Sequence, residues 1–71
     1  MHWNNRIFKH QQGDQIWYSI HETFYDEDGK VELWTQEEIS PYGETVDELI
    51  EHVEQLLNDI KKSKEDIIEY K

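Results

Sequence analysis

Few residues of this chain are arranged in a way that could support metal chemistry. His21 and Glu22 are adjacent, but the zinc-protease pattern needs a second His three residues beyond the Glu, and position 25 is Tyr. On a strand, neighbouring side chains point to opposite faces, so His21 and Glu22 could not chelate one ion together. The four His residues show no ligand spacing. The sequence therefore predicts no metal-binding residues.

The acidic run from Asp26 to Gly29 superficially resembles a calcium-binding loop. When Gly29 is aligned with the sixth position of an EF-hand loop, Phe24 falls on the first ligand position and Thr35 on the twelfth. The twelfth position requires a bidentate Glu, so the alignment fails. A tight hairpin turn explains the same residues, because Gly at the end of the loop can adopt a positive φ.

The sequence also lacks the residues that nucleophilic catalysis requires. The chain has no Cys, and its serines at positions 19, 40 and 63 have no evident general base. No Gly-x-Ser-x-Gly elbow and no Gly-rich phosphate loop is present. We therefore expect no catalytic residues, no cofactor and no enzymatic activity.

The strongest feature of the sequence is its localised negative charge. Thirteen acidic residues and one basic residue, Lys30, lie between Glu22 and Asp59, and the whole chain has a net charge of −10. Such a field repels nucleic acid and anionic membranes and attracts basic protein surfaces or cations. A basic protein partner is therefore expected, without direct nucleic-acid or membrane binding.

Composition indicates a single small domain over residues 1–71 with a thin core. Only 35% of the residues are hydrophobic, but three Trp, four Tyr and two Phe add large apolar surfaces. The absence of Cys rules out a disulfide framework. No apolar run typical of a signal peptide or membrane span is present, so we expect a cytoplasmic protein.

Hydrophobic periodicity predicts an α+β fold, a three-stranded antiparallel meander with one long amphipathic helix. Alternation and turn residues place strands at about residues 4–10, 15–25 and 30–37. A capping box, Thr45 with Glu48, opens a helix at about 46–62. The tail at 63–71 either forms a short extra helix or extends the first.

The helix should cover one face of the sheet and leave the other open. The helix residues expected to face the sheet are Leu49, Val53, Leu56 and Ile60. The sheet face expected beneath them carries Ile16, Tyr18, Ile20, Phe24, Val31 and Leu33. The opposite face would then expose an aromatic patch, made of Trp17, His21, Tyr25 and Trp34.

Several of these segments together resemble a family of small uncharacterised bacterial and phage proteins. The shared pattern runs Ile-His-Glu-x-x-Tyr-Asp-Glu-Asp-Gly-Lys from position 20, then Trp-Thr at 34–35, then Pro-x-Gly-Glu-Thr at 41–45 and Glu-Leu at 48–49. The order of strands, Gly-Glu-Thr cap and helix is also similar to the HicB-like antitoxin fold, in which such a domain binds a small basic toxin. This resemblance implies an antitoxin-like role, but HicB-like antitoxins often carry a DNA-binding segment for which this chain has no room.

We therefore expect a non-enzymatic acidic interaction protein that occludes a basic surface of its partner, such as one that binds nucleic acid. It would act as an antitoxin-like neutraliser or as a phage-encoded inhibitor that mimics nucleic acid. The expected acidic site is Glu48, Glu51, Glu54 and Asp59, and the aromatic patch (Trp17, His21, Tyr25 and Trp34) would add anchors. The alternative is a self-assembling structural homodimer, joined through the aromatic patch, that binds divalent cations weakly.

Overall fold

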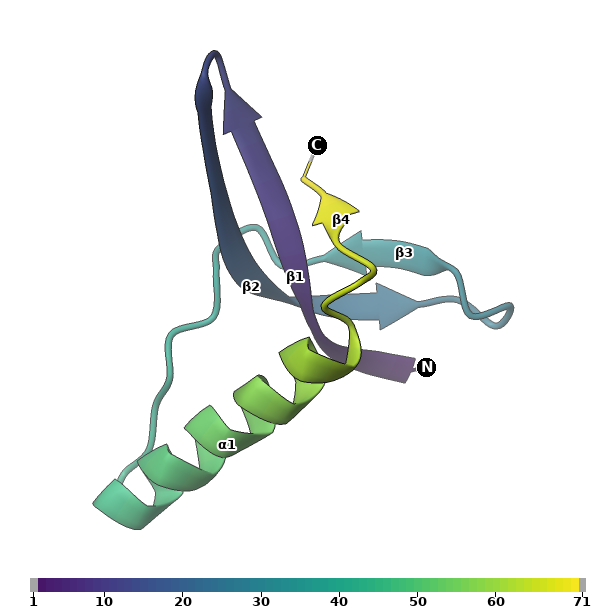
Figure 1. The fold of residues 1–71 in the computed structure, drawn as a ribbon. Helices are drawn as coiled ribbons and strands as arrows, with labels where there is room; N and C mark the ends of the chain where they lie inside the picture. The colour runs from purple at the N-terminus through teal and green to yellow at the C-terminus, as the bar shows by residue number, and fades with distance from the viewer. Residues whose placement is uncertain (1, 71) are drawn as a thin grey trace.

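The protein folds as one curled four-stranded sheet and one helix in a computed structural model, which describes residues 2–70 (Figure 1). The elements follow in the order β1 (His2–Gln12), β2 (Gln15–Tyr25), β3 (Val31–Trp34), α1 (Val46–Lys62) and β4 (Ile68–Glu69). The strand order in the sheet is β3-β2-β1-β4. The α+β class is therefore as expected.

The predicted three-stranded antiparallel meander forms only part of the observed sheet. β1 pairs with β2 and β2 with β3 in antiparallel fashion, but β4 adds to the other edge of β1 in parallel. The tail does not form a second helix and does not extend the first, because α1 ends at Lys62 and the chain turns back toward β1. Both predictions for the tail were wrong.

Two glycine turns set the register of the antiparallel strands. β1 and β2 pair without interruption from His2 opposite Tyr25 to Gln12 opposite Gln15, and Gly13 in the intervening turn has a φ of 61°. Gly29 has a φ of 79° in the second turn. Asn and Gly are favoured at such positions because other side chains are strained there.

The helix begins at a side-chain cap. The Thr45 hydroxyl accepts a hydrogen bond from the Glu48 amide at 3.1 Å, as the sequence indicates. The Glu48 carboxylate accepts from the amide of Glu44 at 3.0 Å, and not from that of Thr45, which the capping box predicts. Gly43 fits against this first turn only because it has no side chain, since a Cβ there would collide with the backbone of Leu49.

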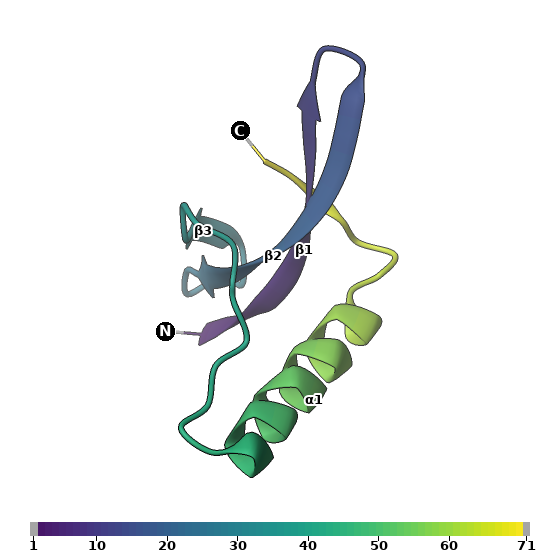
Figure 2. The same cartoon turned by 90° about the vertical axis from the view of Figure 1, so that its left-hand side faces the viewer.

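The helix meets the sheet near its C-terminal end only. Leu56 is the one buried residue of α1, and the Asp59 carboxylate accepts from the side-chain amide of Asn5 in β1 at 2.9 Å. The N-terminal end of α1 projects beyond the sheet, and the connection from β3 follows it outward (Figures 1 and 2). The helix therefore covers a small part of the sheet.

This arrangement corrects the expected core. Leu56 is buried, and Ile60 in α1 together with Ile20 and Phe24 in β2 is half-buried. The remaining members of the expected core are 37–57% exposed: Leu49 and Val53 on the helix, and Ile16, Tyr18, Val31 and Leu33 on the sheet. Strands of 11 residues extend over roughly 36 Å, and a helix that contacts them at one end cannot cover that length.

The main buried cluster lies on the opposite face of the sheet. Phe8 and Thr23 are completely buried, and His21 is 1% exposed. Tyr70 closes this cluster: its amide donates to the Lys9 carbonyl at 2.9 Å, and its ring centroid lies 6.1 Å from that of Phe8. The C-terminal segment therefore covers the face that the sequence analysis left open.

Candidate protein-binding surface

The four acids expected to bind a partner have different roles in the structure. Glu51 and Glu54 are exposed on α1. Glu48 is also exposed, but its carboxylate receives the Glu44 amide at the helix N-terminus. Asp59 is half-buried and holds both the side chain of Asn5, at 2.9 Å, and its backbone amide, at 3.4 Å. Asp59 therefore has a structural role, and its assignment to the binding face stays a prediction.

Five exposed acids lie on the N-terminal half of α1 or immediately before it. We call this group the acidic surface: Glu44, Asp47, Glu48, Glu51 and Glu54. Within residues 2–70 the structure contains a single ion pair, between Arg6 and Asp66 at 3.0 Å. None of the carboxylates in the acidic surface is therefore paired with a cation from the part of the chain that the structure describes.

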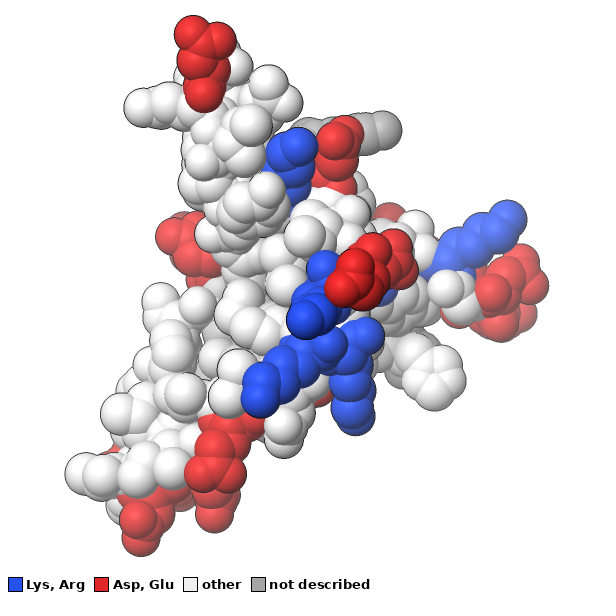
Figure 3. Space-filling model, viewed as in Figure 1, with Lys and Arg blue, Asp and Glu red and all other residues white. Residues whose placement is uncertain are grey.

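Charge along the helix is polarised. The first turn carries Asp47 and Glu48, and the last turn carries Lys61 and Lys62. In Figure 3 basic side chains cluster where α1 approaches the sheet, while acidic side chains occupy its projecting end. Both charges complement the helix macrodipole, which favours anions at the N-terminus and cations at the C-terminus. Glu51 and Glu54 lie beyond the first turn, so the macrodipole does not explain them.

The aromatic patch is not an open face. His21 is buried, and the half-buried Trp34 packs on Phe8 with 5.1 Å between ring centroids. The half-buried Tyr25 donates from its hydroxyl to Asn4 at 2.7 Å. Trp17 alone remains substantially exposed, at 43%. The prediction of an exposed patch was therefore wrong for His21, Tyr25 and Trp34: Tyr70 packs on His21 and Trp34, and Arg6 and Asn4 hold the Tyr25 hydroxyl.

A chain of polar groups joins His10, Ser19 and His21 beneath Tyr70, and the sequence analysis missed it. Ser19 Oγ lies 2.6 Å from His10 Nε2 and 2.7 Å from His21 Nε2, while His21 Nδ1 lies 2.8 Å from the Thr35 carbonyl. A carbonyl can only accept, so Nδ1 of neutral His21 carries the proton and Nε2 accepts from Ser19. The register of β1 and β2 would have revealed this grouping, because it places His10, Ser19 and His21 on one face of the sheet.

In this hydrogen-bonded group, the two histidines lie where a general base for Ser19 would lie. Their contacts, however, serve a structural role. The Ser19 hydroxyl is engaged by imidazoles on both sides, and His21 has no access to a substrate. The ring of Tyr70 stacks on that of His10 with centroids 4.4 Å apart. The hydrogen bonds therefore satisfy polar groups that would otherwise be buried without partners.

Arg6 is a second residue whose role the sequence did not show. It is 8% exposed, and its guanidinium donates to the Tyr25 hydroxyl at 2.8 Å and to the Asp66 carbonyl at 2.6 Å. The ion pair with Asp66 adds to these contacts. Arg6 thereby fastens the segment after α1 to the sheet.

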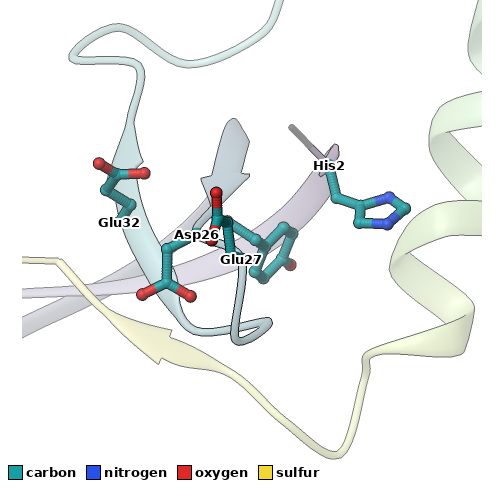
Figure 4. Close-up of a pocket in the computed structure, with 5 residues that line it drawn as sticks. His2, Asp26, Glu27 and Glu32 are labelled. Atoms are coloured by element: carbon teal, nitrogen blue, oxygen red, sulfur yellow. The ribbon is translucent and has the colours of Figure 1, made fainter.

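Further acids line a hollow beside the second hairpin turn, but they do not form a cation site. It is lined by His2, Tyr25, Asp26, Glu27 and Glu32 (Figure 4). Asp26 Oδ1 already accepts from the amides of Asp28 and Lys30, at 2.9 and 3.0 Å, and so stabilises the turn. In the part of the chain that the structure describes, no three His, Asp or Glu side chains are gathered closely enough to hold a metal ion.

Comparison with protein-family models, with curated proteins and with solved structures found no match for this chain. The resemblance to small bacterial and phage proteins and to HicB-like antitoxins therefore stays a prediction. Among residues 2–70, no helix has the length and apolar character that a membrane span requires.

Proposed function

We propose that this chain is a non-enzymatic interaction protein that docks a basic surface of a protein partner through the acidic surface of α1. One observation supports this proposal. Within residues 2–70, no basic side chain forms an ion pair with Glu44, Asp47, Glu48, Glu51 or Glu54. A partner with Lys and Arg side chains would supply those cations.

The spacing of these acids argues against a merely solvated helix face. Within α1, Asp47 and Glu51 are separated by four residues, and Glu51 and Glu54 by three. Such pairs are neighbours on a helix, and like charges at this spacing destabilise it. Exposed helix faces usually mix the two signs, so an all-acidic face is more readily understood if a basic surface offsets the repulsion.

A regular row of carboxylates on a projecting helix could occupy a groove that normally binds phosphates. The helix rises about 1.5 Å per residue, which spreads its acids from Asp47 to Glu54 over roughly 10 Å. Because the N-terminal end of α1 extends beyond the sheet, a partner could approach it without contact with the strands (Figure 1). An antitoxin-like neutraliser or an inhibitor that mimics nucleic acid would act in this way.

Charge reversal at matched sites tests the proposal. The double variant Glu51→Lys/Glu54→Lys changes the acidic surface, while Glu27→Lys/Asp28→Lys makes the same change in net charge at the exposed hairpin turn. Affinity capture from the native host, followed by quantitative mass spectrometry, should recover a basic protein with the wild type and the turn variant. The helix variant should recover at least tenfold less.

Ionic strength provides the second measurement. Capture of the basic partner should fall steeply as salt rises, because charges on an exposed surface are screened over about 10 Å at 0.1 M ionic strength. Equal capture by the two double variants, or capture unchanged between low and high salt, would contradict the proposal.

A further inference from the structure

We propose that two copies of this chain associate through the exposed apolar side of α1, with the two helices antiparallel. The surface concerned, which we call the apolar stripe, consists of Val46, Leu49, Ile50, Val53 and Leu57. This inference does not depend on the proposed function, since no residue of the apolar stripe belongs to the acidic surface, although Asp47 and Glu54 of that surface flank the stripe.

The apolar stripe is unpartnered within the protomer. Its members are 39–73% exposed, whereas Leu56, which attaches α1 to the sheet, is 4% exposed. Successive helical residues are rotated by about 100°, so the middle of the stripe lies roughly 90° around the helix from Leu56. The helix therefore has one apolar side for its own sheet and a second that the sheet does not reach.

The spacing along this second side is that of a helix–helix seam. Val46, Ile50, Val53, Leu57 and Ile60 follow one another at alternating intervals of four and three residues. This is the a/d repeat with which one helix packs its side chains between those of another. Such a repeat has no function on a helix that faces only water.

The protomer exposes more surface than a compact monomer of its mass, and the projecting helix contributes part of that excess. A folded monomer of 8.7 kDa is expected to expose about 4,700 Å², whereas this protomer exposes 5815 Å². The excess of about 1,100 Å² is more than the roughly 800 Å² that each partner buries in a standard stable interface. The radius of gyration, 13.1 Å, likewise exceeds the value of about 11 Å typical of 71 residues.

Charge complementarity selects a second copy as the occupant and sets its orientation. An antiparallel neighbour brings Asp47 of the acidic first turn beside Lys61 in the basic last turn of its partner, and both residues flank the apolar stripe. A parallel neighbour would place acids beside acids. The separation of red and blue along α1 in Figure 3 is the pattern that an antiparallel pair requires. Glu51 lies farther around the helix and stays accessible in such a dimer.

Sedimentation velocity from 1 to 500 μM tests the association with two variants of equal charge. Val53→Glu places a carboxylate in the apolar stripe, and Gln55→Glu places one on the opposite side of the same helix. We expect the wild type and Gln55→Glu to sediment with about twice the protomer mass of 8.7 kDa, and Val53→Glu to dissociate at least tenfold more readily. Both substituted positions are exposed in the protomer, so circular dichroism should show folded variants.

Single-cysteine variants test the orientation, because the wild-type chain contains no Cys. In an antiparallel pair, Glu54→Cys near the middle of the seam should form an intermolecular disulfide on oxidation, and Asp47→Cys near one end should not. Efficient cross-linking at both positions would overturn the antiparallel arrangement. A wild type that stays monomeric at 500 μM, or equal dimerisation of Val53→Glu and Gln55→Glu, would overturn the apolar stripe as a dimer interface, and a foreign protein would then be its occupant.

Discussion

Truncation of Leu56 to Ala should remove most of what holds the helix to the sheet. Leu56 and Phe8 are the two buried hydrophobic residues among residues 2–70, and Leu56 is the one on α1. Leu→Ala changes in protein cores cost about 2–5 kcal/mol, the larger values arising where the site cannot collapse around the cavity. Because α1 contacts the sheet near one end, its neighbours can shift toward the cavity, and we expect about 3 kcal/mol.

That loss is large for a domain of this size. A stability of roughly 0.05–0.15 kcal/mol per residue gives about 4–11 kcal/mol for 71 residues. Urea unfolding should therefore show a clearly lower midpoint for Leu56→Ala at an unchanged slope. Far-UV circular dichroism reports on the helix, and the fluorescence of Trp3, Trp17 and Trp34 reports on the sheet, so the two probes follow both parts of the fold.

Leu33→Ala is the matched control, since it makes the same chemical change at a side chain that is 49% exposed. We expect it to cost less than half as much as Leu56→Ala. Equal losses for the two variants, or a loss below about 1 kcal/mol for Leu56→Ala, would refute the reasoning that Leu56 anchors the helix.

Three further substitutions test individual contacts by urea unfolding. Asp59→Ala should cost about 1–3 kcal/mol because it leaves the buried Asn5 amide without an acceptor, whereas the same change at the exposed Glu54 should stay within about 0.5 kcal/mol; similar effects would contradict the structural role of Asp59. His21→Ala removes a buried ring and its hydrogen bonds and should cost roughly 2–4 kcal/mol, so a wild-type midpoint would show that the polar chain contributes little. Gly43→Ala should destabilise by about 1–3 kcal/mol because its Cβ collides with the first turn of α1, and an unchanged midpoint would show that this turn moves freely.

Local sequence signals predicted β2 and the start of α1, but β3 ends at Trp34 and not at residue 37, and the assembly of the elements was not predicted. Alternation along Gln15–Tyr25 and the Thr45 cap are properties of neighbouring residues, and the structure places β2 and the start of α1 there. The contact between Asn5 and Asp59 joins residues 54 positions apart, and no local pattern encodes it. An acid on a helix surface looks the same in sequence whether it is solvated or receives a buried amide.

The C-terminal segment caused the largest error. Ile67, Ile68 and Tyr70 fit a helix as well as a strand by composition, and β4 forms because the unpaired edge of β1 at Phe8 and Lys9 offers hydrogen-bond partners. Once Tyr70 lies across the sheet, His21 of the aromatic patch is buried and Trp34 is half-buried. The expected coverage by α1 failed for a related reason, since an apolar stripe in sequence does not show how much of it faces its own sheet.

The most direct test of the proposed function is to locate where a basic ligand binds. A titration of the ¹⁵N-labelled protein with a deca-arginine peptide near 0.15 M salt would map the contact residue by residue. We predict the largest amide shifts from Asp47 to Glu54 on α1, with smaller shifts at Glu27 and Asp28 in the hairpin turn, where acids are equally exposed. Shifts centred on that turn, or spread evenly over all exposed acids, would contradict a specific binding surface on the helix.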